Sequence, residues 1–94
     1  MKVITIKFEA DSDKRVHTII GEIWKVMMDI TGKSSEELLR DKRVVLSCKK
    51  KDNKFAIKAV INRATPAVIR ELAPVVFKHG YHDPVSMTTA TKEN

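Results

Sequence analysis

RVVLSCKKKDNKFAIKAVIN, residues 43–62, is the stretch that decides the fold of this chain. Apolar and polar residues alternate on both sides of Asp52–Asn53, a pair typical of a tight turn. The pattern predicts a β-hairpin with strands over 43–50 and 54–62. Four lysines fall within the six positions 49–54, which gathers an unusual amount of like charge at one turn.

The segment before the hairpin predicts one strand and two helices. Residues 2–10 alternate as a strand with one buried face, and residues 16–30 carry apolar residues at helical spacing. Gly32 is a natural end for that helix, and Gly21 inside it predicts a close approach to the sheet. Ser34, followed three residues later by a glutamate, is typical of the start of a short second helix.

The segment after the hairpin predicts a helix that begins at Thr65–Pro66 and ends at Gly80. Pro74 is expected to kink or split it, because proline removes a backbone donor and clashes with the preceding turn. Residues 85–94 are expected to form an edge strand or a flexible tail after a single domain over 1–84.

The order β-α-(α)-β-β-α(-β) predicts an α+β fold: a small antiparallel sheet, with the hairpin at its centre and helices packed on one face. With the last strand the topology is ferredoxin-like, and without it the topology is KH-like. Because side chains alternate along strands, Ile4, Phe8, Phe55 and Cys48 are expected beneath the helices. The opposite face is expected to carry Thr5, Lys7, Glu9, Val45, Ser47, Lys49, Lys54, Ala56 and Lys58.

The charge is unevenly distributed along the chain. Residues 40–63 contain nine lysines and arginines and two aspartates, whereas the other 70 residues contain nine cations and ten acids. A cationic strip of this kind predicts a nucleic-acid-binding module with RNA favoured and weak sequence specificity. The expected contacts are Lys7, Arg43, Lys49, Lys50, Lys51, Lys54, Lys58 and Arg63. The competing interpretation is a solvated lysine surface that blunts a sheet edge and keeps the domain soluble.

Sequence motifs for base stacking, catalysis and metal binding are missing. Both strand phenylalanines fall on the buried parity, so the platform of stacked bases used by RRM domains is not expected. No cofactor or catalytic residue is predicted, and Cys48 is expected to be a core thiol. The run from His79 to Asp83 matches no specific metal site and is expected to end a helix and form a turn.

A pair of apolar residues, Trp24 and Met28, lies one turn apart at the flank of the first helix. They are expected either to close the core edge or to contact a partner or a second copy of the chain. The alternative function is therefore a small regulatory or inhibitor protein, antitoxin-like or a phage-type accessory factor, that binds an acidic protein surface. A single cysteine and no membrane-length apolar run predict a cytoplasmic location.

Overall fold

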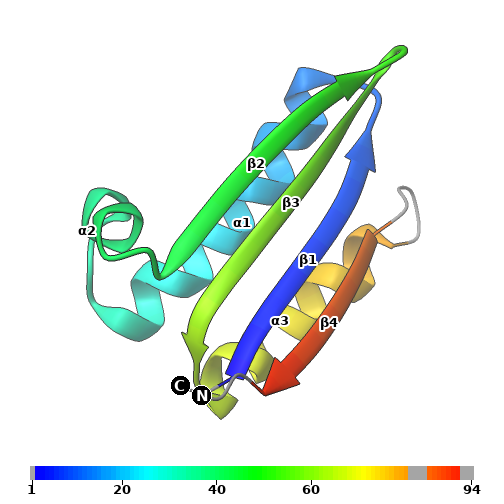
Figure 1. Cartoon of the computed structure of the whole chain (residues 1–94). Helices are drawn as coiled ribbons and strands as arrows, with labels where there is room; N and C mark the ends of the chain where they lie inside the picture. Colours follow the sequence, from blue (N-terminus) through cyan, green and yellow to red (C-terminus); the bar gives the residue numbers. More distant parts are fainter. Residues whose placement is uncertain (1, 81–84, 92–94) are drawn as a thin grey trace.

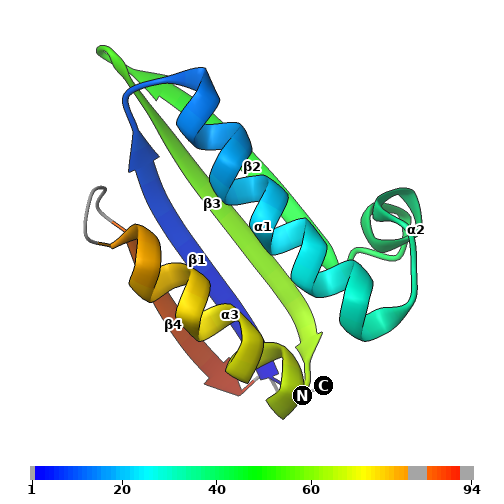
Figure 2. The ribbon, with the colours of Figure 1, turned by 180° about the vertical axis from the view of Figure 1, so that it is seen from behind.

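The computed structural model describes residues 2–80 and 85–91 (Figure 1). Four strands form one antiparallel sheet in the order β2-β3-β1-β4. Helices α1 and α3 lie across one face of this sheet, and the other face carries no helix (Figures 1 and 2). The elements in chain order are β1 (Lys2–Ala10), α1 (Asp13–Thr31), α2 (Ser35–Arg40), β2 (Val44–Lys51), β3 (Lys54–Ala64), α3 (Pro66–His79) and β4 (Val85–Thr91).

The predicted α+β fold is confirmed, and its topology is ferredoxin-like. The segment 85–91 forms β4 and pairs along β1, which excludes the KH-like alternative without a last strand. The sequence predicted that the hairpin lies at the centre of the sheet, and this prediction is wrong for one of its two strands. Its strand β3 is central, but β2 is an edge strand, because β1 inserts between β3 and β4.

The helix ends follow the local sequence signals. Ser12 caps α1 by accepting a hydrogen bond from the Arg15 amide, and Gly32 ends it in the left-handed region at φ 68°. Ser34 and Glu37 form the expected capping box of α2. Thr65 caps α3 by accepting from the backbone amide of the third residue after it.

Two expectations about helix interiors are not met: α3 is not split at Pro74, and Gly21 does not closely approach the sheet. Pro74 lies inside α3, which continues from Pro66 to His79 without a break. Gly21 does not approach the sheet, because it is exposed and a β-carbon at this position would meet no atom within 4 Å. It faces solvent on the outer side of α1, where the core sets no limit on side-chain size.

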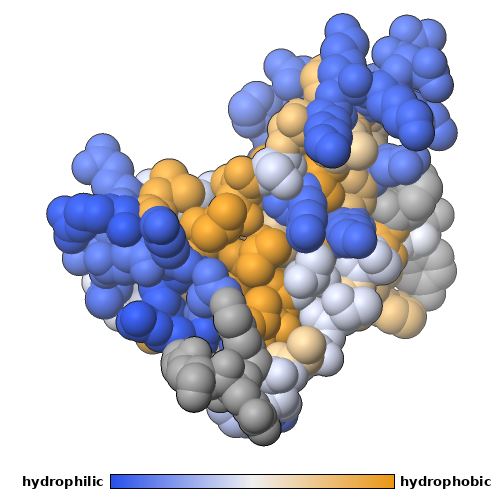
Figure 3. Space-filling model, in the orientation of Figure 1, coloured by the Kyte–Doolittle hydropathy of each residue, from blue (hydrophilic) through white to orange (hydrophobic). Residues whose placement is uncertain are grey.

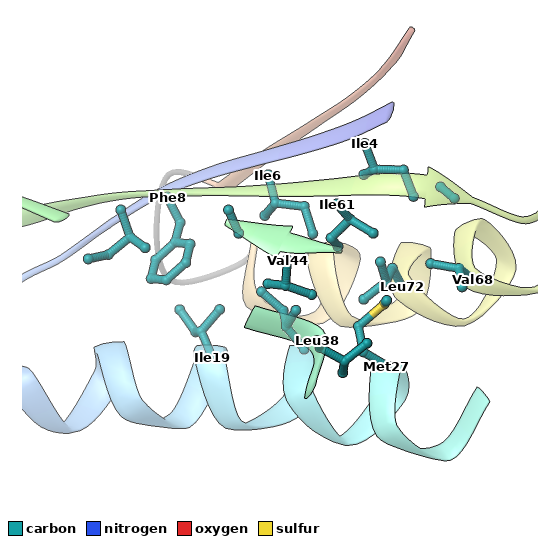
Figure 4. Packing of buried hydrophobic residues seen from close by; sticks show 14 of the residues in the cluster. Ile4, Ile6, Phe8, Ile19, Met27, Leu38, Val44, Ile61, Val68 and Leu72 are labelled. Carbon is teal, nitrogen blue, oxygen red and sulfur yellow. The ribbon is translucent and has the colours of Figure 1, made fainter. Parts of the chain in front are cut away.

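The core fills the space between the sheet and the two long helices (Figure 4). The expected grouping of Phe8, Ile57 and Ile23 is confirmed, with exposed fractions of 2%, 3% and 1%. These side chains belong to one buried cluster with Ile4, Ile6, Val16, Ile19, Met27, Leu38, Val44, Ala59, Ile61, Val68 and Leu72, among others. Burial of this apolar surface is the main stabilising term of the fold.

Cys48 is not a core thiol. It lies on the helix-facing side of β2, opposite Ile57, but it is exposed. Burial falls steadily along β2, from Val44 at 1% exposure through half-buried Leu46 to Cys48 and the lysines beyond. The predicted side of the strand is confirmed. However, β2 is an edge strand whose turn end extends past the helices, so Cys48 is exposed to solvent.

Candidate nucleic-acid interface

The candidate site is the sheet face that carries no helix, called the open face below. Its side chains are those that alternate with the core residues along each strand. They are Val3, Thr5, Lys7 and Glu9 from β1, Val45, Ser47, Lys49 and Lys51 from β2, Lys54, Ala56, Lys58 and Val60 from β3, and Ser86, Thr88 and Ala90 from β4. Figure 3 shows hydrophilic side chains over the turn end of this face and apolar ones over the middle of the sheet.

Strand pairing arranges the charged part of the open face in three rows. Lys51 and Lys54 are direct partners and form the tip row. Lys49, Ala56 and Glu9 are aligned across β2, β3 and β1 as the middle row. The third row crosses all four strands and consists of Ser47, Lys58, Lys7 and Ser86. Rows two residues apart along a strand are separated by roughly 6.8 Å.

The third row places two cations directly opposite each other. Lys7 on β1 pairs with Lys58 on β3, and a seryl hydroxyl flanks the pair on each side. Directly opposed like charges destabilise a sheet. Within residues 2–80 and 85–91, neither lysine makes an ion pair that would offset the repulsion. The pair therefore concentrates positive charge on the two central strands of the open face.

A shallow hollow of about 590 Å³ lies over the middle and third rows. Lys7, Lys49 and Lys58 line it together with the hydroxyls of Ser47 and Ser86. Ammonium groups and hydroxyls donate hydrogen bonds, so this lining suits the oxygens of a phosphate or carboxylate. Glu9 also borders the hollow and is the acidic side chain of the open face among the described residues.

The other predicted contact residues are divided between three places. Lys51 and Lys54 continue the open face at the turn, where both are exposed. Lys50 points to the opposite side of β2, where its ammonium nitrogen lies 5.8 Å from the centroid of the Phe55 ring. Lys50 therefore faces away from the hollow.

Arg43 and Arg63 lie at the far end of the hairpin. Arg43 donates from Nε to the Asn62 carbonyl at 3.3 Å and from Nη2 to the Arg63 carbonyl at 3.5 Å. The hairpin has eight residue pairs, and the seven steps from Val44–Ile61 to Lys51–Lys54 span roughly 23 Å of strand. The eight predicted cations are thus not one patch, and Lys7, Lys49, Lys51, Lys54 and Lys58 are the five that share the open face.

The row that follows the third row, away from the turn, consists of uncharged residues. Val45 pairs with Val60, and Thr5 and Thr88 complete that row across β1 and β4. Val45 is 43% exposed, so the apolar surface is accessible. A cationic part and an uncharged, partly apolar part therefore adjoin each other on the open face.

Trp24 and Met28 lie on α1, away from the open face. Trp24 is half-buried and packs against the core cluster, as expected of a residue that closes the core edge. Met28 is 38% exposed. The pair is too small and too closely joined to the core to carry a binding surface without further contacts.

A polar cluster around the buried side chain of His79 joins α1 to α3 and was not predicted from the sequence. His79 is 3% exposed and bonds through Nε2 to the Glu22 carboxylate, while Arg15 Nη2 lies 3.2 Å from its Nδ1. A guanidinium only donates, so Nδ1 accepts and the ring proton lies on Nε2. Lys78 Nζ is 2.9 Å from the other Glu22 oxygen.

The charge balance of this cluster favours an ionised Glu22. Partial burial acts to raise the pKa of its carboxyl, but hydrogen bonds from Lys78 and His79 and the charge of Lys78 lower it below the usual 4.5. Both nitrogens of His79 have partners, so the ring has no free nitrogen to act as a base. The cluster clamps two helices together and does not resemble a catalytic site.

The described residues contain neither a metal-binding cluster nor a membrane-spanning helix. No group of three or more potential metal ligands occurs within residues 2–80 and 85–91. The His82 and Asp83 part of the histidine-rich run lies outside the described residues. In the described part of the chain, no helix is both long and apolar enough to cross a lipid bilayer.

No protein-family model matches this sequence, and no curated protein matches it. Solved structures that are similar in fold include two designed proteins. "De novo designed protein Foldit4" aligns over 98% of both chains with a TM-score of 0.68 and 14% identity. "De novo designed protein Ferredog-Diesel" aligns over 95% of this chain and 84% of that one, with a TM-score of 0.51 and 10% identity. At such identities the similarity shows the fold alone.

Proposed function

We propose that this protein is a small non-enzymatic nucleic-acid-binding module, with RNA favoured and weak sequence specificity. The observation that carries the proposal is the Lys7–Lys58 pair, held on adjacent central strands between Ser47 and Ser86. A lysine surface needed only for solubility gains nothing from placing two cations directly opposite each other. Directly opposed lysines in a hollow gain stability when an anion binds between them.

Weak sequence specificity follows from the chemistry of the open face. Lysines and hydroxyls contact phosphates and sugars, which position a protein on nucleic acid but carry no base information. Within the described residues, the open face has no aromatic side chain on which a base could stack. Binding would therefore depend on phosphate neutralisation and weaken as salt rises.

The test is a titration of labelled RNA and DNA with the wild-type protein and a Lys7/Lys49/Lys58→Gln variant at several salt concentrations. A matched control, Lys14/Lys25/Arg70→Gln, removes the same charge from exposed positions on α1 and α3. The open-face variant should bind more weakly with a shallower salt dependence, by up to about one unit per lost phosphate contact. The control should bind as wild type does. Equal affinities for all three proteins would exclude the proposal.

The mixed character of the open face also favours a second candidate, a regulatory or inhibitor protein that binds an acidic protein surface. Val45 and Val60 lie directly beside the cationic part, and protein interfaces combine an apolar centre with a polar rim. Substituting Val45 separates the two candidates, because it should weaken a protein complex strongly and a phosphate contact hardly at all. An acidic partner retained by wild type but lost with Val45→Ser would favour the regulatory role.

A further inference from the structure

The three rows of the open face lie at a regular spacing that has a consequence for the ligand. The tip, middle and third rows succeed each other at roughly 6.8 Å, because each is two residues along β2 and β3 from the next. Along one nucleic-acid strand, the helix axis rises about 3.4 Å per nucleotide. Because each step also turns around the axis, neighbouring phosphates are farther apart than this rise, at a distance similar to that between the rows.

We infer that the open face is a track for the backbone of one strand of a nucleic-acid duplex, with one phosphate at each row. This inference rests on the proposed nucleic-acid function and specifies the form of its ligand. The strand runs along β2 and β3 from the turn toward Lys58. The first phosphate lies between Lys51 and Lys54, the second at Lys49, and the third between Lys58 and Lys7.

The track ends at the third row. The next row consists of Val45, Val60, Thr5 and Thr88, which carry no charge. Lys50 points away from the track, and Arg43 donates to backbone carbonyls at the far end of the hairpin. Three phosphates therefore account for the contacts that the open face can make.

A duplex fits this track better than a single strand does. A flexible single strand loses conformational freedom when it is ordered on a surface, and proteins usually offset that loss by stacking its bases on aromatic rings. Phe8 is 2% exposed beneath the helices, and Phe55 lies on the same side of the sheet. In a duplex the phosphates are already ordered, so contacts to phosphates alone suffice.

Glu9 should weaken phosphate binding at the middle row of the track. It shares the middle row with Lys49, with only Ala56 between them, so the middle row carries no net charge, whereas the tip and third rows each carry two cations. A phosphate at Lys49 would lie close to this carboxylate. Glu9→Gln should therefore tighten binding by roughly two- to fivefold, the range of a single exposed charge interaction.

The salt dependence tests the number of phosphates. Three phosphates on a duplex predict a slope of log affinity against log salt near −2.7, a weakening of roughly 40-fold between about 50 and 200 mM salt. Lys7/Lys58→Gln should reduce the slope by about one unit and not two, because both lysines serve one phosphate. Lys51/Lys54→Gln should do the same at the tip row, while Lys50→Gln and Lys14→Gln should leave the slope unchanged. All variants are first checked by circular dichroism for the wild-type fold.

The form of the ligand is tested with short RNA duplexes, DNA duplexes, single strands and a base-free single strand of equal phosphate number. The duplexes should bind at least about tenfold more tightly than the single strands, and the base-free strand should match the base-bearing one. A preference for single strands, or a large loss with the base-free strand, would overturn the track while leaving nucleic-acid binding intact. Duplex binding with a slope that Lys7/Lys58→Gln does not change would also overturn it. Absence of binding to every nucleic acid would remove the proposed function itself.

Discussion

Replacing Gly21 with alanine tests which side of α1 faces away from the sheet. Gly21 is inside the helix, exposed, and not at a positive φ, and an added β-carbon would meet no atom within 4 Å. Gly21→Ala should therefore stabilise the fold by the full difference in helix propensity, about 0.8–1.0 kcal/mol. For a domain of this size that corresponds to a rise in melting temperature of roughly 4–8 °C.

Gly32 provides the matched control with the opposite sign. It also has free space around it, but its φ of 68° is a conformation that costs a side-chain-bearing residue about 1–2 kcal/mol. Gly32→Ala should thus destabilise the fold, although the same methyl group is added. The two glycines are eleven residues apart on one helix, roughly 16 Å, so their effects should add within about 0.5 kcal/mol.

Urea unfolding measures both variants and their combination. The midpoint should rise for Gly21→Ala and fall for Gly32→Ala, with the slope of each transition unchanged. A loss of stability in Gly21→Ala would refute the placement of Gly21 on a solvated helix face. If nucleic acid or a partner protein bound more weakly to this variant while its stability rose, the outer face of α1 would belong to an interface.

Three further outcomes follow from the contacts of single side chains. Trp24→Ala should cost about 2–3 kcal/mol of unfolding free energy, less than a fully buried aromatic, and Met28→Ala less than about 1 kcal/mol. Unchanged stability with a sedimentation shift from dimer to monomer would instead make Trp24 an interface residue. The stability that Glu22 contributes should be complete above pH 4.5 and lost as the pH falls through its lowered folded pKa, as followed by urea midpoints between about pH 3 and pH 7. Glu22→Gln should flatten this dependence and Glu71→Gln, at an exposed position, should not. Cys48 should react with a thiol reagent in the folded protein at nearly the rate of the unfolded chain, and protection of more than about 100-fold would contradict its exposure.

Most of the fold could be predicted from patterns among residues that are close together in the sequence. Ser12, Ser34 and Thr65 cap helices because their hydroxyls satisfy free backbone amides one turn on, a purely local interaction. The alternation in β1 and β3 identified the buried face because a strand exposes every second residue to the same side. Both are decided within a few residues, so sequence alone could show them.

The errors arose where distant segments decide the outcome. Alternation places Cys48 and Lys50 on the helix-facing side, but only the strand order shows that β2 is an edge and lies partly beyond the helices. Arg43 looked like part of the charge cluster, yet the far end of the same hairpin supplies its carbonyl partners. Glu22 and His79 are 57 positions apart, so no local pattern could announce their contact.

The Lys7–Lys58 contact could be anticipated only as a shared face. The sequence put both lysines on the open side, but their direct opposition depends on the register between β1 and β3, which is shifted near Lys2. A shift of one residue would have turned one lysine toward the core. The candidate site therefore depends on one exact register between β1 and β3, whereas a general basic patch would not.

Because β1 is a central strand, the sheet is complete only when two segments far along the chain have paired with it. Residues 2–10 precede in the chain both strands with which they pair, β3 and β4, and in the second pairing Lys2 meets Thr91. Until those strands have paired with it, β1 is an apolar strand with two unpaired edges, the kind of segment that chaperones bind and that aggregates. The hairpin of β2 and β3 can form early through its short turn, so it provides the template to which β1 is added. Such long-range pairing slows folding relative to a fold built from local contacts.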